Sequence, residues 1–145
     1  MIRLKNFMTF DKNLIKENLI ELNNIYGELL KYKDIKEEDF VNNISIRWII
    51  ERGLLGGINL ILDIGNHILA SEYKIYPATY EDILKELFLK GILSQEVYLK
   101  IKGMGSFRNI LAHEYIKIDP RKVYQNYQKF LEIFPELLKE LLKLT

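Results

Sequence analysis

Apolar residues recur at intervals of three and four along almost the whole of this 145-residue chain, and no stretch alternates convincingly with a period of two. Intervals of three and four place apolar side chains on one side of an α-helix, whereas a half-buried strand requires alternation. No repeat is visible and no linker divides the chain. The pattern predicts an all-α protein, an antiparallel up-and-down bundle of four to five helices in a single domain that spans residues 1–145.

Capping residues predict where most of these helices begin and end. Ser, Thr and Asp side chains accept hydrogen bonds from the free N–H groups of a first turn, and a glycine often follows a last turn. Thr79, Ser94 and Asp119 are the predicted N-caps, Gly91 is a predicted C-terminal glycine, and Pro135 is expected to kink or split the last helix. The predicted helices cover residues 10–33, about 37–71, 79–90, 94 through the segment 107–115, and 120 to the C-terminus.

The second predicted helix is central, because its apolar residues cover more than one stripe. It contains Gly53, Gly56, Gly57 and Gly65. Each glycine costs roughly 1 kcal/mol relative to Ala inside a helix, and close approach of another helix would offset that loss. The approaching helix can belong to the same bundle or to a second subunit. The polar side chains within this helix make it too polar for a lipid-facing span, so we expect a buried helix of a cytoplasmic protein.

Composition excludes several kinds of chemistry. The chain has no cysteine, which rules out disulfides, thiolate catalysis and cysteine-based zinc sites. Lys and Arg number 21 against 20 acidic residues, so no global positive field attracts nucleic acid. Any contact with RNA must come from a local patch. The candidate residues for such a patch, a basic rim near the segment 107–115, are Lys100, Lys102, Arg121 and Lys122. The alternative is that these residues only form a solvated charged face.

The segment "FRNILAHEY", residues 107–115, is the most unusual part of the chain and contains one of its two histidines. With an advance of about 100° per residue, Arg108 and Tyr115 share one edge of the helix, and Asn109 and His113 share the neighbouring edge. Ile110 and Leu111 are expected to point away, toward the core. The segment therefore predicts an ordered polar face.

The residues of that face suit cleavage of an RNA phosphodiester. Arg108 offers a planar cationic fork for a phosphate, His113 exchanges protons near neutral pH, and Asn109 can orient the imidazole or bind substrate. The 2′-hydroxyl of RNA is an internal nucleophile, so the protein needs only to move protons and stabilise charge. The hydroxyl of Tyr115 can donate, accept or be modified. From spacing alone, surface residues or a structural hydrogen-bond network remain alternatives.

Asp63 and His67 lie four residues apart on the glycine-rich helix, with Asn66 beside them. This spacing allows a metal site, a place in the lining of the active cleft, or a simple hydrogen-bonded pair. Because no further ligand is apparent, we expect no metal. Asp63, Asn66 and His67 are therefore candidates for the lining of a cleft.

The segment 107–115 also matches a family signature: Arg-Asn, three residues, His, any residue, Tyr. Four blocks fall in the same order and together cover roughly residues 45–130: "ERGLLGGINLILDIGNHILA", "YPATYEDILKELFLKGIL", "MGSFRNILAHEYIKID", which contains this segment, and the following Val123 and Tyr124. On these residues the chain resembles the HEPN-domain toxins, and in particular the HepT-like ribonucleases of MNT–HEPN toxin–antitoxin systems.

The resemblance implies a HEPN-like helical homodimer in which two copies of the motif face a shared cleft. It implies metal-independent endoribonuclease activity without a cofactor, and a partner antitoxin of the minimal nucleotidyltransferase (MNT) type. Carried over by position, Arg108 and His113 are the catalytic pair, Asn109 supports them, and Tyr115 matches the tyrosine that such antitoxins modify with AMP. The alternative is a non-catalytic module that binds a nucleotide or another protein.

Overall fold

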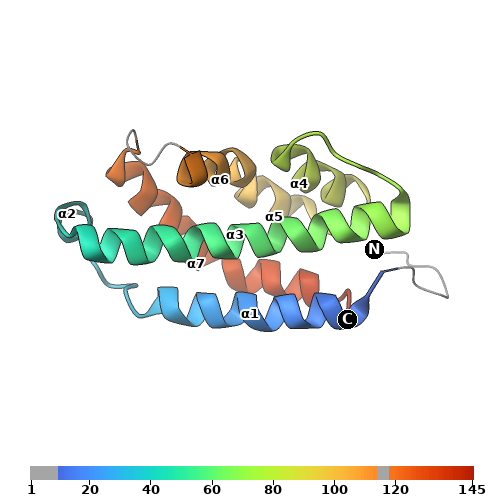
Figure 1. The fold of residues 1–145 in the computed structure, drawn as a ribbon, viewed down its shortest axis with the longest axis horizontal. Helices are drawn as coiled ribbons and strands as arrows, with labels where there is room; N and C mark the ends of the chain where they lie inside the picture. Colours follow the sequence, from blue (N-terminus) through green and yellow to red (C-terminus); the bar gives the residue numbers. More distant parts are fainter. Residues whose placement is uncertain (1–9, 114–117) are drawn as a thin grey trace.

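The computed structural model describes residues 10–113 and 118–145, and seven helices form this part of the chain without any strand (Figure 1). They are α1 (Lys12–Leu30), α2 (Glu37–Asn42), α3 (Ile44–Tyr73), α4 (Tyr80–Leu89), α5 (Gln95–Ile101), α6 (Met104–His113) and α7 (Pro120–Leu142). Their buried side chains form one hydrophobic core cluster. The prediction of an all-α helical bundle is confirmed.

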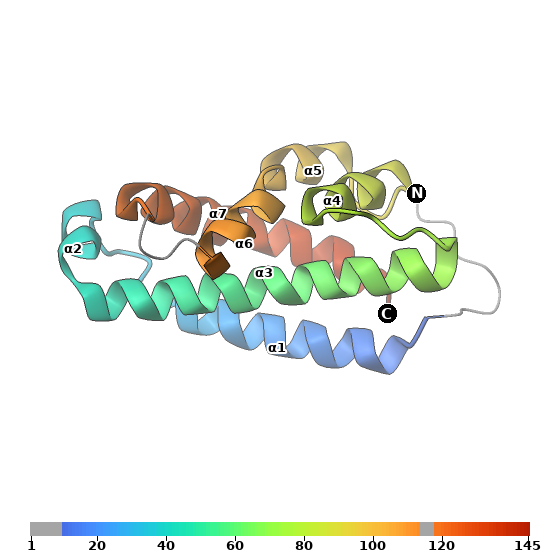
Figure 2. The ribbon, with the colours of Figure 1, turned by 45° about the horizontal axis from the view of Figure 1, so that its top comes forward.

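The long helix α3 is the centre of this bundle. It contacts α1, α4, α6 and α7, and Figures 1 and 2 show α1 on one side of it and α4 and α6 on the other. By length and composition α3 alone among the described helices could cross a membrane, yet 50% of its most apolar window is buried inside the protein. Its first turns differ from the rest, because Ile44, Trp48 and Ile49 are exposed.

The glycines of α3 allow other helices of the same chain to come close. A Cβ added to Gly53 would lie 2.7 Å from Leu29 of α1, and one added to Gly65 would lie 2.7 Å from Leu87 of α4. Real side chains essentially never approach a Cβ so closely, so a larger residue at either position would force the facing leucine side chain to shift. Of the two interpretations offered by the sequence, packing within one bundle is confirmed at these glycines.

Two of the predicted long helices are each divided. Asn43 ends α2 and begins α3, and its side chain accepts a hydrogen bond from the backbone N–H of Ile46 at 3.1 Å. The predicted fourth helix is divided into α5 and α6 at Lys102 and Gly103, where Gly103 has φ +97°. Only glycine adopts this backbone conformation readily, so the chain turns there before the segment 107–115 begins.

The predicted caps are formed. Oγ1 of Thr79 accepts a hydrogen bond from the backbone N–H of Asp82 at 3.1 Å. Oγ of Ser94 accepts one from the N–H of Val97 at 3.2 Å, and Oδ1 of Asp119 accepts one from the N–H of Arg121 at 3.0 Å. Gly91 has φ +75° after the end of α4. Pro135 does not split the last helix, because α7 runs through it from Pro120 to Leu142.

Candidate functional site

Helix α6 presents the predicted polar face and is anchored by a narrow apolar stripe. Phe107 and Leu111, four residues apart, are each 8% exposed, whereas Asn109 and His113 are exposed and Arg108 is half-buried. Ile110 is 38% exposed, so the expectation that it points into the core is wrong. Because α6 lies on the outside of α3 and α4, only one edge of it is covered.

The first turn of α4 holds the first turn of α6 in place. The carboxylate of Glu81 accepts hydrogen bonds from the backbone N–H groups of Gly103, at 3.2 Å, and Ser106, at 3.1 Å. These N–H groups lie at the start of α6, where they have no hydrogen-bond partner within the helix. A negative charge at the N-terminus of a helix is also favourable because of the helix dipole. A Cβ on Gly105 would lie 2.6 Å from the backbone nitrogen of Glu81 and 2.7 Å from the carbonyl carbon of Tyr80. The backbones of α4 and α6 are therefore in direct contact.

This contact brings Tyr80 over Arg108. The guanidinium carbon lies 4.6 Å from the centroid of the tyrosine ring, within the range of a cation–π interaction. From α3, Oδ1 of Asn59 accepts a hydrogen bond from Nε of Arg108 at 2.8 Å. The terminal nitrogen NH1 makes a longer contact of 3.5 Å with Oδ1 of Asn109. Arg108 is thus held by side chains from two other helices.

The sequence analysis did not identify Asn59 or Tyr80 as site residues. The available signals were weak: an amide within the most apolar stretch of the chain, and a tyrosine directly after the cap of a short helix. Spacing in the sequence does not reveal that either residue lies near Arg108, because that proximity depends on how α3, α4 and α6 dock.

A groove opens beside Arg108, between α3, the start of α4 and α6. Its volume is about 420 Å³, and its lining includes Asp63, Asn66, Pro77, Tyr80, Ile83 and Asn109. Burial raises the pKa of the Asp63 carboxyl, while the nearby positive charge of Arg108 acts in the opposite direction. The structure thus brings two of the predicted cleft residues, Asp63 and Asn66, together with Asn109 of the segment 107–115.

His67, the third predicted cleft residue, is not part of the lining of this groove. Its Nε2 accepts a hydrogen bond from the backbone N–H of Asp11 at 3.0 Å, at the start of α1. It therefore joins α3 to α1, and its proton is on Nδ1 when the ring is neutral. Within residues 10–113 and 118–145, no group of three or more His, Cys, Asp or Glu side chains is arranged to hold a metal.

Of the other two residues of the predicted face, His113 alone belongs to the described part of the chain. His113 is the last residue of α6 and its side chain is exposed. Tyr115 lies outside the described residues.

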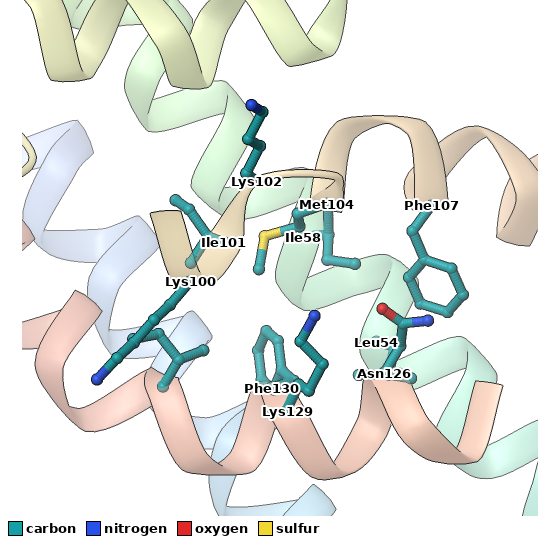
Figure 3. Close-up of a pocket in the computed structure, with 11 residues that line it drawn as sticks. Leu54, Ile58, Lys100, Ile101, Lys102, Met104, Phe107, Asn126, Lys129 and Phe130 are labelled. Atoms are coloured by element: carbon teal, nitrogen blue, oxygen red, sulfur yellow. The ribbon is translucent and has the colours of Figure 1, made fainter. Parts of the chain in front are cut away.

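The basic side chains near the segment 107–115 are partly neutralised. Nζ of Lys100 lies 3.3 Å from a carboxylate oxygen of Glu136, and NH1 of Arg121 lies 3.3 Å from one of Glu37. Figure 3 shows Lys100 and Lys102 at a small cavity of about 30 Å³, with their amino groups directed away from it. That volume is enough for about one water molecule and not for a ligand. These contacts favour the interpretation of a solvated charged face over that of a basic rim.

Similarity to known proteins identifies the family of this chain. Residues 15–141 match the family model described as Ribonuclease HepT-like. The chain is 29% identical over 135 residues to the tRNA nuclease HepT of Aphanizomenon flos-aquae, covering 92% of each chain.

Solved structures share the fold at low sequence identity. The tri-AMPylated Shewanella oneidensis HEPN toxin in complex with MNT antitoxin has a TM-score of 0.78 and 18% identity, over 90% of this chain and 98% of that one. A toxin–antitoxin crystal structure with AMP-PNP has a TM-score of 0.79 and 19% identity, with the same coverage. The cytosolic protein YutE of Bacillus subtilis, of unknown function, has a TM-score of 0.72 and 19% identity, over 94% of each chain. The match to the family model extends over most of the chain, and the protein therefore belongs to the HepT-like ribonuclease family.

Proposed function

We propose that this protein is the toxin of a type II toxin–antitoxin system and acts as a metal-independent endoribonuclease in the cytoplasm. The observation that supports this most directly is the way Arg108 is held. Its Nε is bonded to Asn59 and its plane is covered by Tyr80, while its terminal nitrogens make only the 3.5 Å contact with Asn109 within the described residues. A guanidinium that is fixed in this way keeps its terminal N–H groups for a phosphate.

In the proposed reaction, the 2′-hydroxyl of the substrate attacks the adjacent phosphorus. A base accepts the 2′-hydroxyl proton, Arg108 stabilises the negative charge that accumulates on the phosphorane, and an acid protonates the leaving 5′-oxygen. The products are a 2′,3′-cyclic phosphate and a 5′-hydroxyl, and no cofactor takes part. His113 is exposed at the end of the same helix and is the proposed proton carrier, with Asn109 in a supporting role.

One histidine cannot accept and donate a proton at the same moment, so we propose a homodimer that places two motifs across a two-fold axis. We propose that the dimer forms through the second and fourth predicted helices, which correspond here to α3 and α6. Exposed apolar side chains on these helices support this: Trp48 is 63% exposed and Ile49 49% on α3, and Ile110 is 38% exposed on α6. Burial of such side chains between subunits would contribute favourable free energy. Sedimentation that shows an active monomer at assay concentration would contradict the dimer.

Cleavage of single-stranded RNA by purified protein in EDTA tests the activity. We expect products with 2′,3′-cyclic phosphate ends, and a rate about 10²- to 10⁴-fold lower for His113→Ala. Activity that disappears in EDTA and returns with Mg²⁺ would contradict the mechanism. A protein that binds RNA or nucleotides but does not cut them would instead support a non-catalytic binding module.

We further propose that an MNT nucleotidyltransferase antitoxin neutralises the toxin by transferring AMP to Tyr115. On a continued helix, Tyr115 falls two turns after Arg108 on the same edge, so an added AMP would set an anion against the arginine that binds RNA. Intact mass spectrometry after co-expression should show one or more additions of AMP to the wild type and none to Tyr115→Phe. Equal modification of the variant, or loss of toxicity without added mass, would contradict covalent neutralisation.

A further inference from the structure

The groove beside Arg108 is an unassigned cavity that adjoins the proposed phosphate site. Two residues belong to both places: Tyr80 covers the guanidinium and lines the groove, and Asn109 contacts NH1 and lines the groove. The volume of about 420 Å³ lies within the range of small-molecule sites and accommodates one nucleotide base with its sugar.

The lining combines apolar side chains with polar groups. Pro77, Tyr80 and Ile83 provide apolar surface, and Asp63, Asn66 and Asn109 provide carboxylate and amide groups. Within residues 10–113 and 118–145, the side chains of Asp63 and Asn66 make no hydrogen bond to protein. Their hydrogen-bonding capacity is therefore available to a ligand.

The charge of Asp63 limits what that ligand can be. A second phosphate would be repelled by the carboxylate, so the groove does not suit the RNA backbone. An uncharged planar group that presents hydrogen-bond donors fits better. A nucleobase attached to the phosphate held by Arg108 is such a group, and it would lie against the apolar walls.

We propose that this groove binds the base next to the scissile phosphate and that Asp63 selects guanine. A carboxylate accepts two parallel hydrogen bonds from adjacent donors. Among the four bases only guanine presents two such donors on one edge, N1–H and N2–H. Its neighbouring O6 is an acceptor, for which the amides of Asn66 and Asn109 supply N–H donors. The inference rests on the proposed function, because it takes Arg108 as the phosphate site.

Binding of free nucleotides tests the groove without any need for cleavage. We expect calorimetry on the wild-type protein to show 5′-GMP bound at least about tenfold more tightly than 5′-IMP, which lacks the 2-amino group, and than 5′-AMP. Asp63→Asn, which keeps the size of the side chain, should remove this preference. Asp39→Asn on α2, an exposed aspartate outside the groove, should leave it unchanged.

The outcomes separate the groove from the reaction. Equal affinity for the three nucleotides, or no binding of any at millimolar concentration, overturns the guanine site, even if the protein cuts RNA. If the protein binds 5′-GMP selectively through Asp63 but leaves RNA intact, the guanine site is supported and the proposed ribonuclease activity is contradicted. If RNA is cut, replacing the guanosine beside the cleaved bond with inosine should slow cleavage by a factor similar to the loss of affinity.

Discussion

Asn59 and Arg108 are joined by a 2.8 Å hydrogen bond from Nε to Oδ1, although 49 residues separate them in the chain. The amide comes from the central helix α3 and the guanidinium from the peripheral helix α6. This bond fixes the orientation of an arginine that would otherwise sample several rotamers, and a fixed orientation favours binding of a phosphate in one geometry.

The first prediction concerns this bond. Asn59→Ala removes the acceptor and should lower kcat/KM for RNA cleavage about tenfold or more, because a hydrogen bond to a charged group contributes about 1.5–3 kcal/mol. Initial rates on a defined RNA measure the effect. Asn23→Ala, at an exposed position of α1, is the matched control and should keep wild-type rates. Wild-type activity in a folded Asn59→Ala protein would show that the orientation of Arg108 does not limit cleavage.

Tyr80 gives a second prediction. Its ring covers the guanidinium at 4.6 Å, so Tyr80→Leu should lower kcat/KM several-fold through loss of a cation–π interaction of about 0.5–2 kcal/mol. Tyr80→Phe keeps the ring and should retain most of the activity. The comparison of the two variants, each with its melting temperature, separates the effect of the ring from that of the hydroxyl. A larger loss in Tyr80→Phe than in Tyr80→Leu would argue against this role for the ring.

The third prediction concerns the backbone contact between α4 and α6. Gly105→Ala places a Cβ 2.6 Å from a backbone atom of Glu81, so the helices must separate. We expect a loss of about 1–3 kcal/mol in the free energy of unfolding, together with reduced cleavage. Urea titration measures the stability.

A glycine in open space is the matched control for Gly105. A Cβ on Gly27 of α1 would meet nothing within 4 Å, and Gly27→Ala should raise stability by about 0.5–1 kcal/mol. If Gly105→Ala were as stable as Gly27→Ala, the close approach of α4 and α6 would be excluded.

The fourth prediction uses the ionisation of Asp63. Burial raises its pKa and the charge of Arg108 partly offsets that rise. Replacing Arg108 by Leu removes the cation that favours the carboxylate, so the pKa of Asp63 should rise further. Arg108→Lys keeps a positive charge and should produce a smaller change. An NMR titration of the Asp63 carboxyl measures this pKa in the wild type and in the two Arg108 variants. A lower pKa of Asp63 in Arg108→Leu than in the wild type would contradict the proximity of the two groups.

Local rules in the sequence determined where most helical segments lie and where several helices begin. Thr79, Ser94 and Asp119 cap the helices that follow them because a cap needs only a side chain and an N–H two or three residues away. The order of Arg108, Asn109 and His113 around α6 follows for the same reason, since it depends only on spacing. These features involve contacts over a few residues, and the sequence contains everything that decides them.

Tertiary structure alone decided which side chains surround that face. Asn59 and Tyr80 reach Arg108, and His67 turns to Asp11, because of where α3, α4, α6 and α1 dock. The exposure of Ile110 depends in the same way on how far α6 is covered by its neighbours. Docking results from the packing of whole helix surfaces, including glycines such as Gly105 whose function depends on a distant backbone. Spacing along one helix carries no information about such distant surfaces, so the sequence pattern predicted the helices and their polar face, and the packed structure determined the site.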